Sequence, residues 1–369
     1  MIRLVKRLLV VAVLAVPPVL KAYSIFACRG LGQYQPAWEY LSVQPREMTN
    51  FSANFLLEYN YTTEDERFND AFTIRPNRLN FFFKLPWKFG LTAQISERYN
   101  MDFYSKSDSV TSGEYTLIRK VKSTGGIEGF RVGLDRSFFD IVYLGAGYER
   151  YFGGVLERWD SEVFTLTETG DSILTDFYER TVDSLLYHFR GNGFWGVAGA
   201  DLGPVQLRGF YGICLPLTVT TEVATTRDTS VVDSTSYTPP AEFGGIARYS
   251  ARKFGVELSY IQLTGDDTDL SLVPGRIVEL NTLWKLDDFD LTAGAGYNQW
   301  GVQTVAGEGI SDINLSVGAR IPIEEFGFGT IGLTGGLRKG GDISEFHIEF
   351  KAGVQFQELW KRRERMWGG

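Results

Sequence analysis

Cysteine, histidine and long apolar segments are all scarce in this sequence. Its 369 residues include only 2 Cys and 2 His, which excludes a disulfide scaffold and leaves almost no room for a zinc site. The net charge is −8 and the basic residues form no stripe, so a nucleic-acid partner is not expected. After residue 22 no run approaches 18 uninterrupted apolar residues, which excludes further helical membrane spans. Phosphate-binding and dinucleotide motifs are absent as well, and we expect no metal and no cofactor.

Glycine and aromatic residues are abundant instead. The chain has 41 Gly, and aromatic residues make up 14% of it while charged residues make up 22%. This composition is typical of an all-β transmembrane barrel, in which lipid-facing and lumen-facing side chains alternate along each strand.

Residues 1–22 have the three parts of an export signal. The start is basic, residues 8–20 are apolar, and Ala22 offers a small residue for cleavage. Because the apolar run is short and holds Pro17 and Pro18, a retained membrane anchor is only the alternative. Cleavage would remove four basic residues and no acidic residue, which leaves a mature charge near −12.

From residue 51 onward, apolar side chains recur at every second position. One face of the first segment carries Phe51, Ala53, Phe55, Leu57, Tyr59 and Tyr61. The last segment repeats the pattern with Phe346, Ile348, Phe350, Ala352, Val354 and Phe356. A half-buried soluble sheet also alternates, but these runs reach the nine to eleven residues that a tilted strand needs to cross a bilayer.

Short and long connections take turns along the chain. The short ones lie at 86–90, 135–138, 201–204, 251–254, 286–289 and 324–327. The longer polar ones lie at 62–75, 104–120, 153–188, 219–240, 265–274 and 303–310, followed by the brief 339–342. Outer-membrane barrels sort their links in this way, with tight periplasmic turns and longer external loops.

This reading predicts an antiparallel β-barrel of about fourteen strands. They are expected near 51–61, 76–86, 90–103, 115–134, 139–152, 185–200, 205–218, 241–250, 254–264, 275–286, 289–302, 311–322, 328–338 and 344–357. The expected units are an export signal at 1–22, a plug or leader at 23–50, the barrel at 51–357 and a basic periplasmic tail at 358–369. An even strand number places both barrel ends on the periplasmic side of an outer membrane.

Several segments carry more specific expectations. Residues 155–188 still alternate, so their strands are expected to continue beyond the membrane as a hairpin, and the Thr/Ser-rich residues 218–238 are expected to form a solvated outer loop. Aromatic residues beside the short turns predict a periplasmic girdle of rings at headgroup depth: Trp87, Phe89, Phe138, Phe139, Phe254, Phe289 and Phe326. Residues 23–50 are irregular but apolar, which favours a plug over a disordered leader. Cys28 follows a poor lipidation motif and is expected to be a small buried thiol.

The lumen-facing positions are the candidate solute-binding residues. They combine both signs of charge with apolar side chains, whereas the lumen of a water-filled porin is more uniformly polar. The mixed lining therefore favours an amphipathic or hydrophobic solute. The alternative is that the apolar residues simply pack against the plug. The candidates are Leu56, Glu58, Phe82, Lys84, Arg98, Arg131, Arg208, Phe210, Arg248 and Glu257. No catalytic residue is expected: Ser172 lies in a Gly-Asp-Ser turn and His188 far from it in the chain, so a barrel-embedded hydrolase is the least supported alternative.

The chain resembles the FadL/TodX-type outer-membrane transporters of long-chain fatty acids and aromatic hydrocarbons. The resemblance rests on the leader Ser24–Gly32 with Gly30-Leu31-Gly32, on Gln44-Pro45 ahead of the first strand, on the strand number, and on the ending Phe350–Arg363 with its basic, Trp-containing tail. The family's Asn-Pro-Ala motif is Gln44-Pro45-Arg46 here. The resemblance implies that a hydrophobic solute is caught outside, passes the plug and leaves sideways through the wall into the bilayer.

Two classes of function follow. The first is passive uptake of hydrophobic or amphipathic small molecules across an outer membrane, with membrane lipid and a fatty-acid-like solute as partners and without enzymatic activity. The alternative is a non-transport barrel, structural or associated with secretion, that uses its loops or its tail for protein partners.

Overall fold

The computed structural model describes residues 33–34, 49–64, 67–106, 110–112, 115–169, 172–224, 229–264, 274–303, 309–323, 327–341 and 343–357. Within these ranges the chain is almost entirely β-strand, with one short 3-10 helix, η2 (Pro86–Lys88). None of the helical structure described is long and apolar enough to cross a membrane. The export signal, the tail, Cys28 and all of the plug except residues 33–34 and 49–50 lie outside these ranges.

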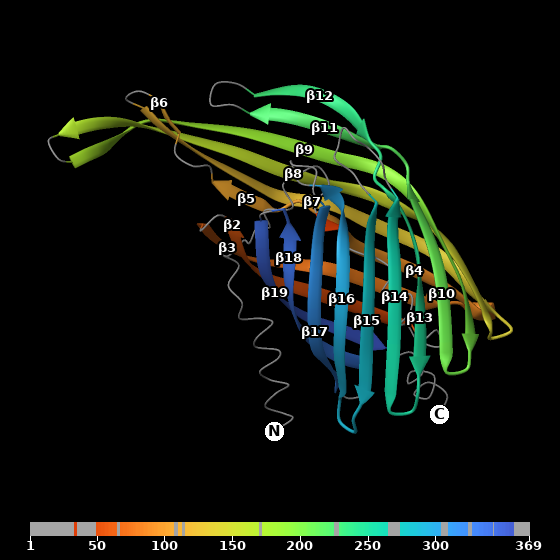
Figure 1. Cartoon of the computed structure of the whole chain (residues 1–369). Coiled ribbons are helices and arrows are strands. Elements are labelled where there is room, and N and C mark those ends of the chain that lie inside the picture. Colours follow the sequence, from red (N-terminus) through yellow and green to blue (C-terminus); the bar gives the residue numbers. More distant parts are fainter. Residues whose placement is uncertain are drawn as a thin grey trace, which may run out of the picture.

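Fourteen antiparallel strands close into a barrel (Figure 1). They are β2 (Asn50–Glu64), β3 (Arg67–Lys84), β4 (Phe89–Asn100), β7 (Tyr115–Phe138), β8 (Val142–Thr169), β9 (Ser172–Leu202), β10 (Val205–Cys214), β13 (Ala241–Ser250), β14 (Phe254–Thr264), β15 (Gly275–Lys285), β16 (Asp290–Gln303), β17 (Gly309–Ile323), β18 (Gly327–Gly340) and β19 (Ile343–Gln357). β19 pairs with β2 from Gln357↔Asn50 to Ser344↔Thr63 and thereby closes the ring. The predicted fold class and strand number are confirmed.

The two ends of the barrel differ in the length of their connections. The rim that holds the start of β2 and the end of β19 also holds the short turns, such as those between β7 and β8 and between β9 and β10. In an exported barrel this rim is the periplasmic one. We call it the inner rim and the opposite one the outer rim.

Five further strands lie at the outer side. They are β1 (Gln33–Tyr34), β5 (Phe103–Lys106), β6 (Val110–Ser112), β11 (Leu217–Ala224) and β12 (Thr229–Tyr237). The β11–β12 hairpin joins β9, and β5 and β6 join β7. Residues 218–238 therefore form mostly strand rather than the loop expected, because their alternating Thr and Val residues find a partner edge on β9.

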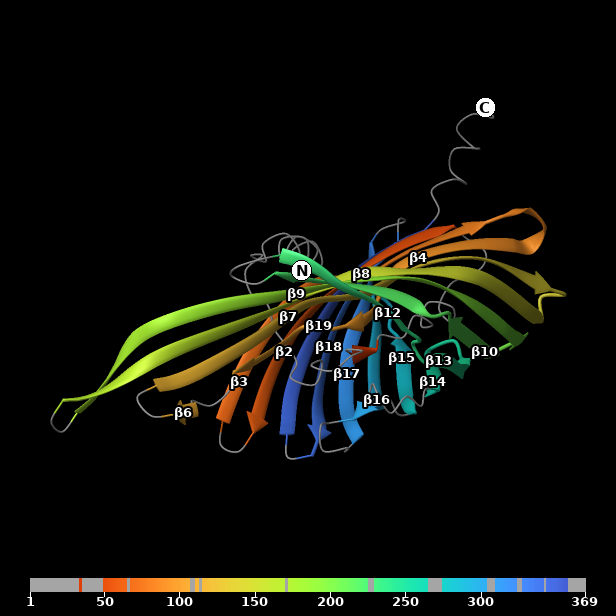
Figure 2. The ribbon, with the colours of Figure 1, turned by 90° about the horizontal axis from the view of Figure 1, so that it is seen from above.

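The strands β8 and β9 extend far beyond the barrel. They hold 28 and 31 residues, whereas about eleven suffice to cross a bilayer, and Figures 1 and 2 show them leaving the barrel as one long hairpin. This arrangement confirms the hairpin expected for residues 155–188. The long polar link expected at 62–75 was wrong, because β2 and β3 continue through it and pair as far as Glu64↔Arg67.

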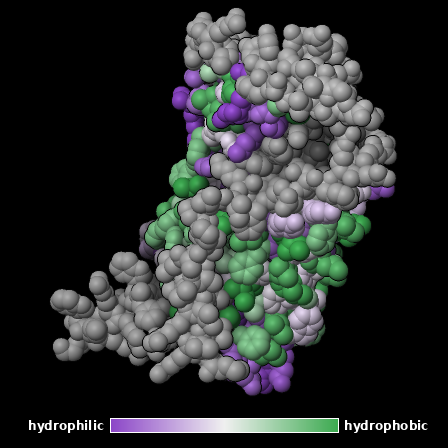
Figure 3. All heavy atoms as spheres, turned by 90° about the vertical axis from the view of Figure 1, so that its left-hand side faces the viewer, coloured by the Kyte–Doolittle hydropathy of each residue, from purple (hydrophilic) through white to green (hydrophobic). Residues whose placement is uncertain are grey.

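Apolar side chains point outward around the wall. Phe81, Phe83 and Leu333 are exposed while the alternate residues Asn80 and Phe82 are buried, and a space-filling view shows apolar side chains gathered as a band on one side of the barrel (Figure 3). Rings also flank the turns of the inner rim, where Trp87 and Phe139 are 83% and 88% exposed. The placement fits the aromatic girdle that was expected, and Phe326 lies outside the described residues.

Two glycines, Gly133 and Gly147, leave space inside the barrel for the indole ring of Trp195. A Cβ at Gly133 on β7 would lie 2.3 Å from the Trp195 ring of β9, and one at Gly147 on β8 would lie 2.7 Å from it. Gly147 pairs with both Gly133 and Trp195, so the indole crosses two strands that carry no side chain there. The interior can close over the ring only because these positions are glycine.

Candidate functional site

The lumen contains most of the predicted site residues. Of the ten candidates, seven are buried inside the barrel: Leu56, Glu58, Phe82, Arg98, Arg131, Arg208 and Phe210. Arg248 and Glu257 line an internal cavity. Lys84 departs from the expectation, because it ends β3 at the inner rim and its side chain is exposed. Placement in the lumen gives these residues access to a passing solute, and their role in binding stays a prediction.

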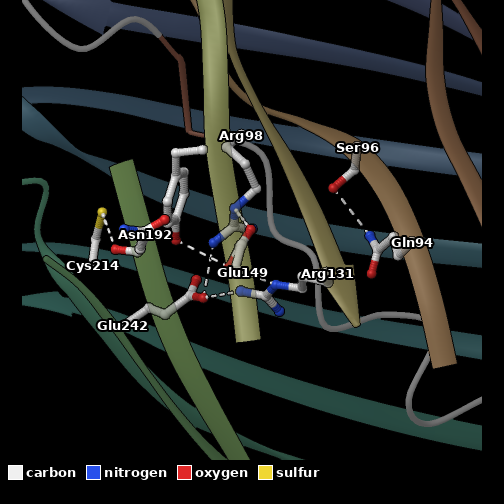
Figure 4. Close-up of polar contacts among 9 residues, drawn as sticks. Gln94, Ser96, Arg98, Arg131, Glu149, Asn192, Cys214 and Glu242 are labelled. Atoms are coloured by element: carbon white, nitrogen blue, oxygen red, sulfur yellow. Dashed lines mark hydrogen bonds and ion pairs between the residues drawn. The ribbon is translucent and has the colours of Figure 1, made fainter. Parts of the chain in front are cut away.

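Four charged side chains meet in the middle of the lumen (Figure 4). We call them the lumen ion cluster: Arg98 on β4, Arg131 on β7, Glu149 on β8 and Glu242 on β13. Arg131 contacts Glu149 at 2.7 Å and Glu242 at 2.6 Å. Arg98 contacts the same two carboxylates at 3.1 and 2.8 Å.

The lumen ion cluster spans the interior rather than following the wall. Five strand-to-strand steps separate β4 from β13 along the wall, which is about 24 Å at a strand spacing of about 4.8 Å. A direct contact between Arg98 and Glu242 therefore crosses the lumen. Each of the four side chains is at most 5% exposed, so the charges are held by one another rather than by bulk water.

A β-bulge turns two adjacent residues of β4 into the lumen. The register against β7 shifts between Glu97 and Tyr99, and both Arg98 and Tyr99 are buried. Strict alternation would send one of them to the lipid. Tyr151 on β8 adds a hydroxyl group to the lumen ion cluster, because it donates a hydrogen bond to Glu149 Oε2 at 3.0 Å.

Apolar side chains fill the lumen on both sides of these charges. The outer apolar cluster lies toward the outer rim and consists of Tyr99, Met101, Ile127, Tyr151, Val155, Phe189, Cys214, Leu217, Val219, Trp300 and Ile310. The inner apolar cluster consists of Tyr143, Trp195, Val197, Phe210, Ile246, Ile261 and Ile277. This layering is the opposite of a water-filled channel, whose lumen is polar throughout.

A second group of buried charges lines the opposite wall. Arg338 on β18 makes an ion pair with Glu345 on β19 and lies 3.5 Å from Asp312 on β17. Its guanidinium also lies 4.7 Å from the centre of the Trp300 ring, so the outer apolar cluster ends on a cation–π contact. His347 approaches Asp312 at 3.8 Å.

A cavity of about 470 Å³ is lined by residues of the consecutive strands from β13 to β19. Its wall mixes charged residues such as Arg248, Glu257 and Arg320 with apolar ones such as Ile261 and Ile277. A lining of this kind suits a small molecule with an apolar body and few polar groups.

The wall is interrupted between β3 and β4. These strands pair over only seven positions, from Lys84↔Gly90 to Arg78↔Ser96. Asn77 is the extra residue of a bulge, and the residues of β3 from Pro76 to Arg67 pair with β2 but with no other described strand, while Tyr99 of β4 pairs with Tyr34 of β1. Since a spanning strand needs nine to eleven residues, the pairing stops within the height of the membrane.

The residues weighed for catalysis do not meet. Ser172 and His188 lie 16 positions apart on the same extended strand β9, which separates them by roughly 50 Å. The ring of His188 lies 3.7 Å from Glu222 on β11. Among the described residues, no three His, Cys, Asp or Glu side chains are grouped so that they could hold a metal ion.

Sequence reasoning missed Glu149 and Glu242 as lumen residues. Alternation back from Tyr151 would have placed Glu149 inside, and alternation back from Arg248 would have placed Glu242 there. What no pattern could indicate is that both carboxylates meet the same two arginines from distant strands.

The closed fourteen-strand barrel has the fold of FadL/TodX-type outer-membrane transporters, which confirms the predicted resemblance at the level of the fold. The chain is similar to the CymD monoaromatic hydrocarbon channel, with a TM-score of 0.55 and 10% identity over 92% of this chain and 98% of that one. It is similar to the Ralstonia pickettii toluene transporter TbuX, with a TM-score of 0.55 and 11% identity over 89% and 95%. It is also similar to a Pseudomonas aeruginosa FadL homologue, with a TM-score of 0.56 and 11% identity over 84% of this chain and 90% of that one. No family model and no curated protein matches the sequence.

Proposed function

We propose that this barrel carries hydrophobic or amphipathic small molecules passively across the outer membrane and releases them sideways into the bilayer. The observation that carries the proposal is the stretch of β3 from Pro76 to Arg67, which pairs with β2 but with no second strand among the described residues. Backbone groups that face hydrocarbon without partners cost several kcal/mol each, and a passage between the lumen and the bilayer is a physical reason for a barrel to retain such a break. The apolar layers of the lumen support a hydrophobic solute.

Further support comes from the structural neighbours, among them a hydrocarbon channel and a toluene transporter. We therefore take a small aromatic hydrocarbon and a fatty acid as the first solutes to test. Export by a cleaved signal at 1–22 and regulation by a plug at 23–50 are parts of the same proposal, and the process needs no cofactor and no catalytic residue.

A disulfide across the break tests the exit. Asn77 and Glu97 are the next positions in register after the last pair, Arg78↔Ser96, so Asn77→Cys and Glu97→Cys together can join β3 to β4. A matched pair, Ser316→Cys with Thr334→Cys, joins β17 to β18 where the ladder is continuous. Toluene uptake into proteoliposomes is expected to fall on oxidation of the first pair and to return on reduction. Equal uptake by both oxidised variants contradicts the sideways exit.

The long β8–β9 hairpin favours a second candidate function. It projects far from the barrel (Figure 2), and its projecting part carries ion pairs such as Arg180–Asp160 within the hairpin and Lys120–Glu162 to β7 rather than the apolar clusters of the lumen. A surface-exposed sheet of this length suits contact with another protein. If neither toluene, fatty acid nor a small polar solute crosses liposomes that contain the barrel, this partner-binding role replaces transport.

A further inference from the structure

The lipid-facing wall has a hollow over β7, β8, β9 and β10. Its volume is about 800 Å³. Four small residues that face outward form its floor, and larger apolar and aromatic side chains form its edges. The floor positions are Ala146, Gly196, Ala198 and Gly209, and the edges are Leu134, Leu144 and Tyr211. We call this feature the wall hollow.

Strand register brings the floor positions together. Ala146 pairs with Gly196, and Ala198 pairs with Gly209. A Cβ built at Gly209 would come no closer than 3.9 Å to any atom, and one at Gly196 no closer than 3.8 Å. These glycines are therefore not required by a close backbone approach, and they leave space on the surface that larger residues would fill.

One arginine stands at the edge of the wall hollow. Arg136 of β7 pairs with Leu144 of β8, and Leu144 pairs with Ala198 of β9. Arg136 is therefore at the same height on the wall as Leu144 at the edge of the hollow and Ala198 in its floor. The guanidinium carbon lies 4.8 Å from the Phe89 ring centre and 4.9 Å from that of Phe138. Its Nε atom is buried and has no hydrogen-bond partner among the described residues.

The height of Arg136 indicates what it faces. It lies two positions before the end of β7 at the inner rim, beside Phe138 of the aromatic girdle. Rings of this kind mark headgroup depth. A cation at that depth on the outer surface faces the phosphates of the periplasmic leaflet, and an arginine binds phosphate oxygens through two parallel hydrogen bonds.

We propose that the wall hollow and Arg136 form a binding site for one phospholipid of the periplasmic leaflet. The phosphate accepts hydrogen bonds from Arg136, which Phe89 and Phe138 hold in place, and an acyl chain lies across the small residues of the hollow. The occupant is a phospholipid because the site combines a cation at headgroup depth with an apolar channel that runs from it toward the membrane centre. The site does not depend on the transport proposal, since it lies on the outside of the barrel.

Native mass spectrometry of the full mature barrel tests this site. The probes are dioleoyl phosphatidylglycerol and dioleoylglycerol, which share their chains but differ in the phosphate. On the unmodified protein we expect one retained phosphatidylglycerol and about tenfold weaker retention of dioleoylglycerol, since a charged hydrogen bond contributes about that factor. Equal retention of the two probes overturns the proposal. Lipopolysaccharide retained in place of phosphatidylglycerol also overturns it.

Matched variants locate the bound lipid. Arg136→Gln removes the charge, and Gly209→Leu fills the floor; each is expected to lower phosphatidylglycerol retention about tenfold. The controls are Arg252→Gln, an exposed arginine in another turn of the inner rim, and Gly335→Leu, a position on β18 where a Cβ meets nothing within 4 Å. Both controls are expected to bind like the unmodified protein. Unchanged retention in Arg136→Gln and Gly209→Leu contradicts the site.

Discussion

The Nη2 atom of Arg98 lies 2.8 Å from the Oε1 atom of Glu242, and this contact joins opposite sides of the barrel interior. Arg131 reaches the same oxygen at 2.6 Å. One carboxylate thus ties β13 to both β4 and β7 through the centre of the lumen. Passage through the middle of the barrel requires these contacts to separate, so we regard Glu242 as the residue that holds the lumen closed.

Replacement of Glu242 by Gln is expected to weaken the fold and open the lumen. Removing one partner of a buried ion pair leaves an uncompensated charge and costs about 3–5 kcal/mol, here on Arg98 and Arg131. The free energy of unfolding, measured with urea in detergent or bilayers, is expected to fall by that amount, and single-channel conductance is expected to rise. Glu257→Gln, which lies in the cavity wall outside the lumen ion cluster, serves as control. Conductance that is the same in both variants contradicts the role of Glu242.

An arginine on the lipid face is expected to destabilise the barrel. Phe81 points outward and is 38% exposed, whereas the preceding residue of β3, Asn80, is buried. Phe81→Arg near the bilayer midplane should cost roughly 2–4 kcal/mol. Asn281→Arg provides the comparison, because Asn281 lines the internal cavity and its substitute can enter that space. Urea unfolding in lipid vesicles measures both, and equal losses of stability would refute the assigned facing.

A shortened β8–β9 hairpin separates transport from partner binding. Ser161 pairs with Thr181, so residues 162–180 can be replaced by Asn-Gly, which forms a tight two-residue turn. The lumen clusters are left intact, and we expect toluene uptake and thermal stability to be unchanged. Loss of uptake in a barrel that is otherwise folded would show that the hairpin tip takes part in solute capture.

Acid is expected to loosen the projecting part of the same hairpin around Asp160, which pairs with Val182. The hydrogen bond from Arg180 lowers the pKa of Asp160 below its ordinary value of 3.8. A carboxylate with a depressed pKa in the folded state stabilises at pH values above its ordinary pKa, and this contribution is lost as the pH falls through the folded value. Amide exchange in β8 and β9 around Asp160 should therefore accelerate in the native protein below about pH 4, relative to Asp160→Asn at the same pH. Parallel exchange in the two proteins at every pH contradicts the coupling.

Much of the fold could be predicted because strand facing is a local property. Every second residue of a barrel strand meets lipid, so the apolar positions around Phe81 and Ile348 indicated strands directly. The alternation of short and long links then predicted the strand number and the rim that holds both ends of the barrel. The interior side chains Arg98, Arg131 and Phe210 followed from the same alternation.

Other features depend on contacts between strands that are distant in the sequence. The bulge at Glu97–Tyr99 breaks the alternation and turns Tyr99 inward, and the β3–β4 break depends on where two ladders stop. The bulge leaves no signal in the local pattern, because register is set by pairing rather than by composition. Pro76, which has no N–H to donate to a ladder, stands in β3 next to the break but does not indicate where the β4 ladder stops.

The sequence by itself determined that this chain forms a membrane-spanning barrel and which face of each strand meets lipid, because both follow from a period of two residues. Only the tertiary structure decided that Glu242 meets Arg98 and Arg131, that Trp195 lies over Gly133 and Gly147, and that the wall is interrupted beside β4. These features arise from the closure of the ring, which brings residues more than a hundred positions apart, such as Arg98 and Glu242, into hydrogen-bonding distance.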